Sequence, residues 1–196
     1  MRVGEIVESN STGFVCESYE LNRPPALGSL VKVHVGEARD LYGVVCYGET
    51  GSLDPGRRAV RRSTDEVYDH QVYRESPQLE HVLRTEFTSV AVGIVERGIV
   101  VQGLPSLPPP LHFSVHTCSS EETILFTENL YYFRLLLRAS GPVAVEQLLA
   151  ANVREVYIER GSDEEWLREA AREAASLLKH DYDRLMAVLY AIQPVR

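Results

Sequence analysis

Short stretches of alternating apolar and polar residues fill the first half of the chain and predict β-strands. The clearest cover 2–7, 13–16, 30–35 and 41–47, with Gly, Asn, Ser and Pro clusters between them. No helix-length segment separates them, which favours an antiparallel barrel or sandwich over a parallel sheet. A further alternating stretch at 87–102 predicts that the strands resume and close the sheet.

Polar and mixed residues separate the two sets of strands. Residues 48–62 are rich in Gly, Asp, Pro and Arg, which predicts an exposed loop on one rim. The following stretch, 65–84, is mixed and partly helical in pattern. Ser76 is typical of an N-cap and Pro77 of a first helical position, so we expect a helix to begin there.

The second half changes to a helical period. Four prolines within 103–110 predict a stiff, extended connector, and a short strand-like stretch follows at 111–115. Apolar residues then fit one broad helical face around 121–139. Two more helical segments are expected at 143–152 and 163–192, with a β-like stretch at 153–158 between them. Ser162 and Glu165 have the spacing of a capping box.

Together these patterns predict an α+β protein. We expect an N-terminal closed antiparallel β-barrel of six or seven strands in residues 1–117 and a C-terminal helical subdomain in residues 118–196. A sandwich built from the same strands has the same sequence pattern and stays an alternative.

Composition and charge narrow the function classes. The 196 residues include 28 Asp and Glu against 20 Lys and Arg, a net charge of −8, so the overall field repels nucleic acids. No apolar run has the length that crosses a bilayer, and residues 1–10 contain no apolar signal-peptide core. The three cysteines are far apart and lack C-x-x-C spacing, which is typical of buried thiols in a reducing compartment. We therefore expect a cytoplasmic protein without a membrane partner.

The sequence contains neither of the two common nucleotide-binding motifs. The glycine-rich stretch 48–56 lacks the lysine of a phosphate-binding loop, and a Gly-x-Gly-x-x-Gly fingerprint is absent. We expect no cofactor, no resident metal and no catalytic residue, hence a protein that is not an enzyme.

His112, His116 and Cys118 form the one spacing that fits metal ligands. On a continuous strand residues 112, 116 and 118 point the same way, so two imidazoles and a thiol would converge. The competing interpretation is a partly exposed strand with Leu111, Phe113 and Val115 facing the core, and we favour it. A nucleophilic Cys118 with His116 as its base is disfavoured, because a buried thiol is the more common state.

Arginines provide the single basic cluster. Its members are Arg57, Arg58, Arg61 and Arg62. They can grip a phosphate or an acidic partner surface, and they are the candidate binding residues. The competing interpretation is a solvated loop whose arginines pair with the nearby acids Asp65, Glu66 and Asp69.

Two apolar features carry open alternatives. The aromatic run 131–133 is typical of a helix core, with a ligand-stacking face as the alternative. The apolar stripe within 163–192 predicts either an oligomer seam or packing against the rest of the chain.

The order of the glycine-led strands carries a resemblance. Gly4 opens 4–9, Phe14 follows, Gly28 opens 28–33 and Gly43 lies within 42–45. This order resembles the HAS-barrel, the N-terminal β-barrel of HerA-type hexameric translocases and of F-type ATP synthase subunits. The proline-rich stretch 108–112 is similar to the exit from such barrels, and the resemblance covers about residues 1–117.

In HerA-type proteins this barrel leads into a P-loop ATPase domain, whereas here helical residues follow. The resemblance therefore implies no catalytic residue, only the barrel's role as an assembly and partner-docking element. The expected function is that of a non-catalytic intracellular module that docks a protein partner. The expected partner is a P-loop ATPase or ATP synthase assembly, and the resemblance also allows formation of a homo-oligomer. The alternatives are a metal-binding protein or small enzyme using His112, His116 and Cys118, and single-strand nucleic-acid binding by the barrel.

Overall fold

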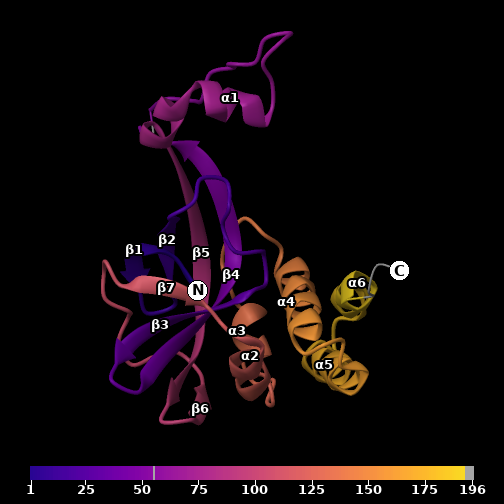
Figure 1. The fold of residues 1–196 in the computed structure, drawn as a ribbon. Coiled ribbons are helices and arrows are strands. Elements are labelled where there is room, and N and C mark those ends of the chain that lie inside the picture. The colour runs from indigo at the N-terminus through magenta and orange to yellow at the C-terminus, as the bar shows by residue number, and fades with distance from the viewer. Residues whose placement is uncertain (55, 193–196) are drawn as a thin grey trace.

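The fold is given by a computed structural model, which describes residues 1–54 and 56–192. Seven strands form one antiparallel sheet: β1 (Arg2–Asn10), β2 (Gly13–Ser18), β3 (Leu30–Gly36), β4 (Arg39–Ser52), β5 (Leu83–Glu96), β6 (Ile99–Gln102) and β7 (Ser114–Thr117). Their order is β2-β1-β7-β3-β4-β5-β6, and β2 also pairs with β5. That pairing closes six strands into a barrel and leaves β6 as an extra strand on β5 (Figure 1). The prediction of a closed antiparallel barrel is confirmed.

Apolar side chains that alternate along the strands pack together inside the barrel. They are Ile6, Phe14, Cys16, Val31, Val33, Leu41, Val45, Phe87, Ala91 and Val115, all at most 1% exposed. The residues between them point outward. Closure also needs small residues, because a Cβ at Gly4 would lie 2.3 Å from the Glu17 carbonyl oxygen on β2. This close approach is what glycine permits in a bent barrel strand.

The helices are α1 (His70–Glu75), the 3₁₀ helix η1 (Pro77–His81), α2 (Ser120–Phe126), α3 (Phe133–Leu136), α4 (Val145–Glu159), α5 (Glu164–Leu177) and α6 (Tyr182–Ile192). The last five follow the barrel and form the helical part of the α+β fold. None of the helices in residues 1–54 or 56–192 combines the length and the apolar character needed to cross a membrane.

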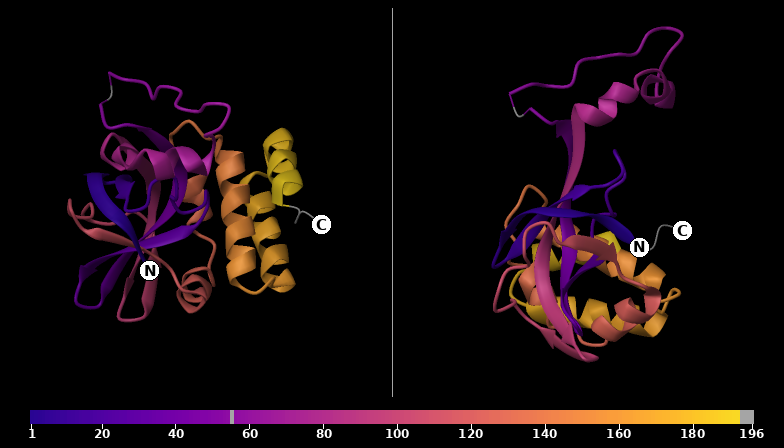
Figure 2. Two further views of the ribbon diagram at one scale, coloured as in Figure 1. Left: turned by 45° about the horizontal axis from the view of Figure 1, so that its top comes forward. Right: turned by 60° about the vertical axis from the view of Figure 1, so that its left-hand side comes forward.

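A second apolar core joins the barrel to the helices. On its barrel side the Tyr42 ring stacks on Phe126 of α2, with ring centroids 4.6 Å apart. α4 lies beside the barrel, and α5 and α6 pack against α4 on the side away from it (Figure 2). The C-terminal apolar stripe is buried there, with Trp166, Ala170 and Ala174 at most 3% exposed. Its packing is therefore within the chain, at least for these residues.

The single helical face expected around 121–139 is wrong, because the chain forms two short helices, α2 and α3. The turn between them is held from outside. The Gln102 amide nitrogen donates to the carbonyls of Phe126 and Asn129, each at 2.7 Å. The Gln102 amide oxygen accepts from the Tyr132 N–H at 3.1 Å. The Gln102 side chain therefore provides hydrogen bonds to backbone groups that a continuous helix would have satisfied with its own backbone.

The β-like stretch expected at 153–158 is also wrong, because α4 runs without a break through it. Its buried residues, Leu148, Leu149, Asn152, Val153 and Val156, recur at the helical period. The local β propensity of the valines is overridden by burial of this helix in the core between the barrel and the other helices.

The segment 163–192 forms two helices rather than one. The N-cap of α5 is Asp163, whose carboxylate accepts from the N–H groups of Glu165 and Trp166, and not Ser162, which has φ 65°. A second cap begins α6, where the Asp181 carboxylate accepts from the Arg184 N–H at 3.2 Å.

The loop on the barrel rim begins later than expected. β4 continues to Ser52 and β5 begins at Leu83, where the two residues are paired in register. At Ser76 the chain forms the 3₁₀ helix η1 rather than an α-helix, with Pro77 in its first turn, and Ser76 makes no side-chain cap.

Candidate functional site

Residues 53–54 and 56–82 form a projection from the barrel, which we call the arm. The long β4–β5 hairpin extends beyond the other strands and holds α1, η1 and the connecting loop at its tip (Figure 1). Among the described arm residues only Leu79 is buried. Since a folded segment is normally fixed by burial, an arm with so little of it offers most of its surface to solvent or to a partner.

The four candidate arginines, Arg57, Arg58, Arg61 and Arg62, all lie on the arm, and the structure brings them to one pocket. This arm pocket has a volume of about 500 Å³. Its apolar lining includes Val60, Val72, Leu79, Val82 and Leu83. The sequence shows the arginines but not this lining, because the apolar residues are scattered over the arm.

Ion pairing leaves most of this charge uncompensated. Within the described part of the chain, Arg57 pairs with Asp54 at 3.5 Å, and both side chains are more than half exposed. The structure shows no salt bridge from Arg58, Arg61 or Arg62 to a described residue. Pairing of the cluster with Asp65, Glu66 and Asp69, the competing interpretation of the sequence, is therefore not formed.

A second, larger cleft separates the arm from the barrel. It has a volume of about 800 Å³ and is lined by residues 17–23 of the barrel and by His70, Tyr73, Glu80 and His81 of the arm. Tyr73 lines both this cleft and the arm pocket. The Asn22 N–H donates to Thr85 Oγ1 at 2.7 Å, and both residues line the cleft.

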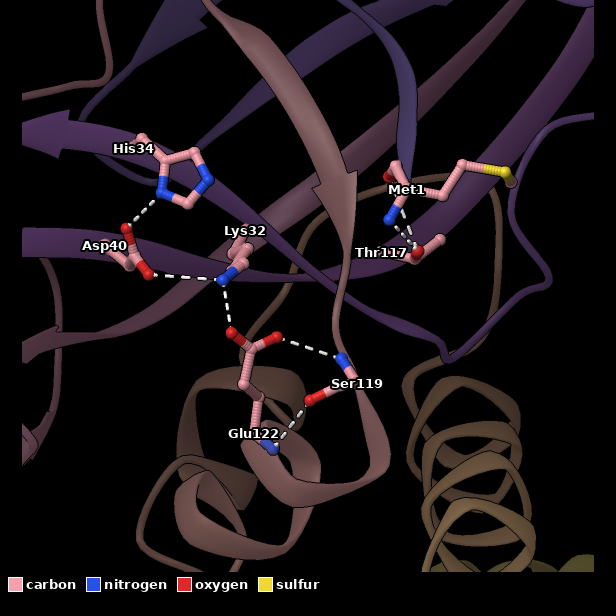
Figure 3. Close-up of polar contacts among 7 residues, drawn as sticks. All are labelled: Met1, Lys32, His34, Asp40, Thr117, Ser119 and Glu122. Carbon is pink, nitrogen blue, oxygen red and sulfur yellow. Dashed lines mark hydrogen bonds and ion pairs between the residues drawn. The ribbon is translucent and has the colours of Figure 1, made fainter.

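A polar cluster on the outer face of the barrel joins it to α2 (Figure 3). Lys32 of β3 forms ion pairs with Glu122 and, at 3.4 Å, with Asp40. Asp40 Oδ1 also lies 2.6 Å from His34 Nδ1. Ser119 and Glu122 form a reciprocal capping box, in which the Ser119 N–H donates to Glu122 Oε2 at 2.9 Å. One carboxylate therefore caps α2 and neutralises a buried ammonium.

Protonation in this cluster follows from its contacts. Burial disfavours the charged form of Lys32, but its hydrogen bond to Glu122 and the negative charge of Asp40 outweigh it and raise its pKa. Burial likewise disfavours charged Glu122, yet its bonds to Lys32 and Ser119 lower its pKa. Both groups are charged at neutral pH. Since each charge has a partner, the cluster is built to hold α2 on the barrel.

The three residues of the metal hypothesis are not brought together. β7 begins only at Ser114, and His112 precedes it with φ 64° and pairs with Glu5 at 2.8 Å. His116 lies against His34, with ring centroids 4.7 Å apart. Over the described residues no group of three or more His, Cys, Asp or Glu side chains is placed to hold a metal ion. The strand expected at 111–115 forms later, as β7. Val115 faces the core as expected, whereas Leu111 and Phe113 are exposed.

Cys118 packs against the helical core instead of facing a base. Burial raises the pKa of its thiol, and the nearby Glu122 carboxylate raises it further. A raised pKa keeps the sulfur protonated and weakly nucleophilic.

The aromatic run 131–133 divides between core and surface. Tyr132 and Phe133 are fully buried, whereas Tyr131 is 66% exposed. The Tyr132 hydroxyl donates to Asn152 Oδ1 at 2.9 Å, and the Asn152 amide donates to the Gly28 carbonyl at 2.8 Å. This run is therefore mainly core.

Sequence reasoning missed the Lys32 cluster. A signal existed in Ser119-Ser120-Glu121-Glu122, the spacing of a capping box. The other half of the pairing, Lys32, looks like any outward residue of an alternating strand, so its partner depends on the tertiary fold.

Fold and site together define a small closed antiparallel barrel with a helical layer on one side and a basic, apolar-lined arm. Comparison of the sequence with known protein families and with curated proteins finds no match.

Proposed function

We propose that this protein is a non-catalytic assembly or partner-docking module, and that the arm is the element that docks. The observation that carries the proposal is the arm itself. It projects from the barrel on two long strands, buries one described residue of its own, and presents an apolar pocket with unpaired arginines. Exposed apolar surface next to charge is typical of protein interaction sites.

The rest of the molecule supports a scaffold role. The barrel interior is packed with apolar side chains, and the helices that follow the barrel cover part of its outer face. The polar groups between barrel and α2 are engaged with one another. The resemblance of residues 1–117 to the HAS-barrel agrees with this role and points to a P-loop ATPase-type assembly as the partner, with a homo-oligomer as a further form of assembly.

The test compares the full chain with a variant that lacks the arm. Because Ser52 and Leu83 are paired, an Asn-Gly turn in place of residues 53–82 closes the hairpin without disturbing the barrel register. Both proteins are tagged, used to capture partners from the source cell, and compared by mass spectrometry. Light scattering gives their oligomeric state, and circular dichroism checks the fold.

We expect a partner that binds the full chain and not the shortened variant, and that binds again when both proteins are purified. A partner retained equally by the two variants would contradict docking through the arm. Turnover of a nucleotide by the purified chain, with its rate unchanged through a second purification, would contradict the non-catalytic part of the proposal.

A further inference from the structure

The arm pocket combines two kinds of surface that a single ligand must match. Its apolar lining is mainly aliphatic, with Tyr73 as an aromatic member, and parts of it are open to solvent: Val60 is 79% exposed and Val82 is 44% exposed. Its volume of about 500 Å³ lies within the range of roughly 300–1,000 Å³ that is common for sites enclosing a ligand group. A large apolar side chain from a partner would cover this lining.

The rim supplies the second requirement. Four guanidinium groups lie within six residues of chain on the same pocket, and only Arg57 has a described ion-pair partner. Guanidinium groups bind carboxylates with two parallel hydrogen bonds, which a lysine cannot do. This local positive charge stands out in a protein of net charge −8, so it selects a negatively charged ligand.

We propose that the arm pocket binds an acidic amphipathic segment of a partner protein, in which one or two large apolar residues are flanked by Asp or Glu. The apolar residues occupy the aliphatic lining, and the carboxylates pair with the arginines. The proposal rests on the docking function argued above and names the chemistry of the partner.

A nucleic acid fits this pocket less well. Phosphates match the arginines, but the lining is mainly aliphatic and offers few faces for stacked bases. A protein segment satisfies both the charge and the lining.

The experiment selects ligands from a displayed library of random twelve-residue peptides, with the full chain as bait. We expect enriched peptides in which Leu, Phe or Trp is flanked by acids. The affinity of one synthetic peptide is then measured by fluorescence anisotropy at two salt concentrations. Binding should weaken as salt rises, because the arginine–carboxylate pairs are exposed.

Two variants and one matched control define the site. The triple variant Arg58→Glu, Arg61→Glu and Arg62→Glu reverses three charges of the pocket and should weaken peptide binding by about 10-fold or more. The control reverses the same amount of charge elsewhere, in Arg134→Glu, Arg138→Glu and Arg168→Glu, all exposed and outside the arm. It should leave the affinity within about 2-fold.

Val82→Asp tests the lining separately and should also weaken binding by about 10-fold, because it places a carboxylate on an apolar surface. Equal loss in the control triple variant would overturn the proposal, and so would full binding by Val82→Asp. Selection of peptides without acids would overturn it as well.

An arginine-dependent affinity for a twenty-nucleotide single strand, with no peptide selected, would replace the proposal by nucleic-acid binding. The failure of this inference is distinguishable from failure of the docking function. If the arm is required for capture of a cellular partner but selects no acidic peptide, docking stands and the acidic-segment proposal falls.

Discussion

Glu122 in the first turn of α2 pairs with the ammonium of Lys32, which projects from the outer face of the barrel. The Lys32 side chain is 11% exposed and the Glu122 side chain is 32% exposed, so the pair is largely shielded from water. Because Glu122 also accepts from the Ser119 N–H, it connects the start of α2 to the barrel. The helical part and the barrel are thus joined by charge as well as by apolar contacts.

Replacement of this carboxylate should therefore destabilise the protein. We expect Glu122→Ala to lower the free energy of unfolding by about 2–3 kcal/mol, since it removes half of a capping box and leaves a poorly hydrated ammonium. Urea denaturation measures the change. The neighbouring Glu121→Ala, which removes an exposed carboxylate from the same turn, should change stability by about 0.5 kcal/mol or less. An equal loss in both variants would show that the Lys32 pair contributes nothing special.

His116 should make stability sensitive to mild acid. Burial lowers its pKa from 6.5, and the positive charges of His34, the N-terminal amine, Lys32 and Arg2 lower it further. The unfolded chain therefore takes up a proton at His116 more readily than the folded chain. The stability that neutral His116 contributes is fully present above about pH 6.5 and is lost as the pH falls through the lowered pKa.

The measurement is the urea midpoint between pH 8 and pH 5.5. His116→Gln should reduce the loss of stability on acidification. His70→Gln, on the exposed helix α1, should keep the wild-type profile. If the two variants have the same pH profile, His116 is not the group responsible.

Gly28 should tolerate no side chain, because it lies against the backbone of α4. It has φ +90°, and a Cβ there would lie 2.4 Å from the Ala151 carbonyl carbon. We expect Gly28→Ala to destabilise by about 2–4 kcal/mol, the sum of left-handed strain and of displacing α4.

Gly98 is the matched control for that position. It has φ +79°, but a Cβ there has open space around it. Gly98→Ala should therefore cost only the strain, about 1 kcal/mol. Thermal unfolding of both variants measures the difference, and similar losses would mean that the contact between Gly28 and α4 is unimportant.

The strands were predictable from sequence because their interior positions alternate strictly, as in Val31 and Val33 of β3. The helical breaks were not predictable. The end of α2 depends on Gln102, which lies on β6 and is distant in sequence from the turn that it holds. Likewise α4 stays helical through Val153 because its buried face requires it, whatever the local propensity.

The candidate site divides in the same way. The arginines were visible as a charged run, but the apolar lining that makes them a pocket comes from α1, η1 and the start of β5. The metal hypothesis failed because it assumed a continuous strand from His112 to Cys118, whereas the chain turns at His112 with a positive φ. Spacing locates ligands only when the backbone between them is regular.

The three thiols should be slow to react in the folded protein. Cys16 and Cys46 are buried, and burial raises the pKa of Cys46 to about 11. The pKa of Cys118 is raised as well. A chromogenic disulfide reagent at pH 7.5 should label far less than one equivalent within minutes, and three equivalents in denaturant. Rapid labelling of Cys118 in the native chain would contradict this prediction and would show that its thiol is reactive.

The arm should be the first place that trypsin cuts. The segment that carries Arg57, Arg58, Arg61 and Arg62 is exposed and has no regular secondary structure, so a protease can bind it in extended form. β4 and β5 remain paired on either side of the cut, so the two fragments should stay together in gel filtration and separate only in denaturant. Replacing the four arginines by Gln should slow this cleavage without changing the unfolding midpoint. First cuts at Arg168 or Arg172 on α5, with the arm intact, would mean that the arm is better protected than its low burial indicates.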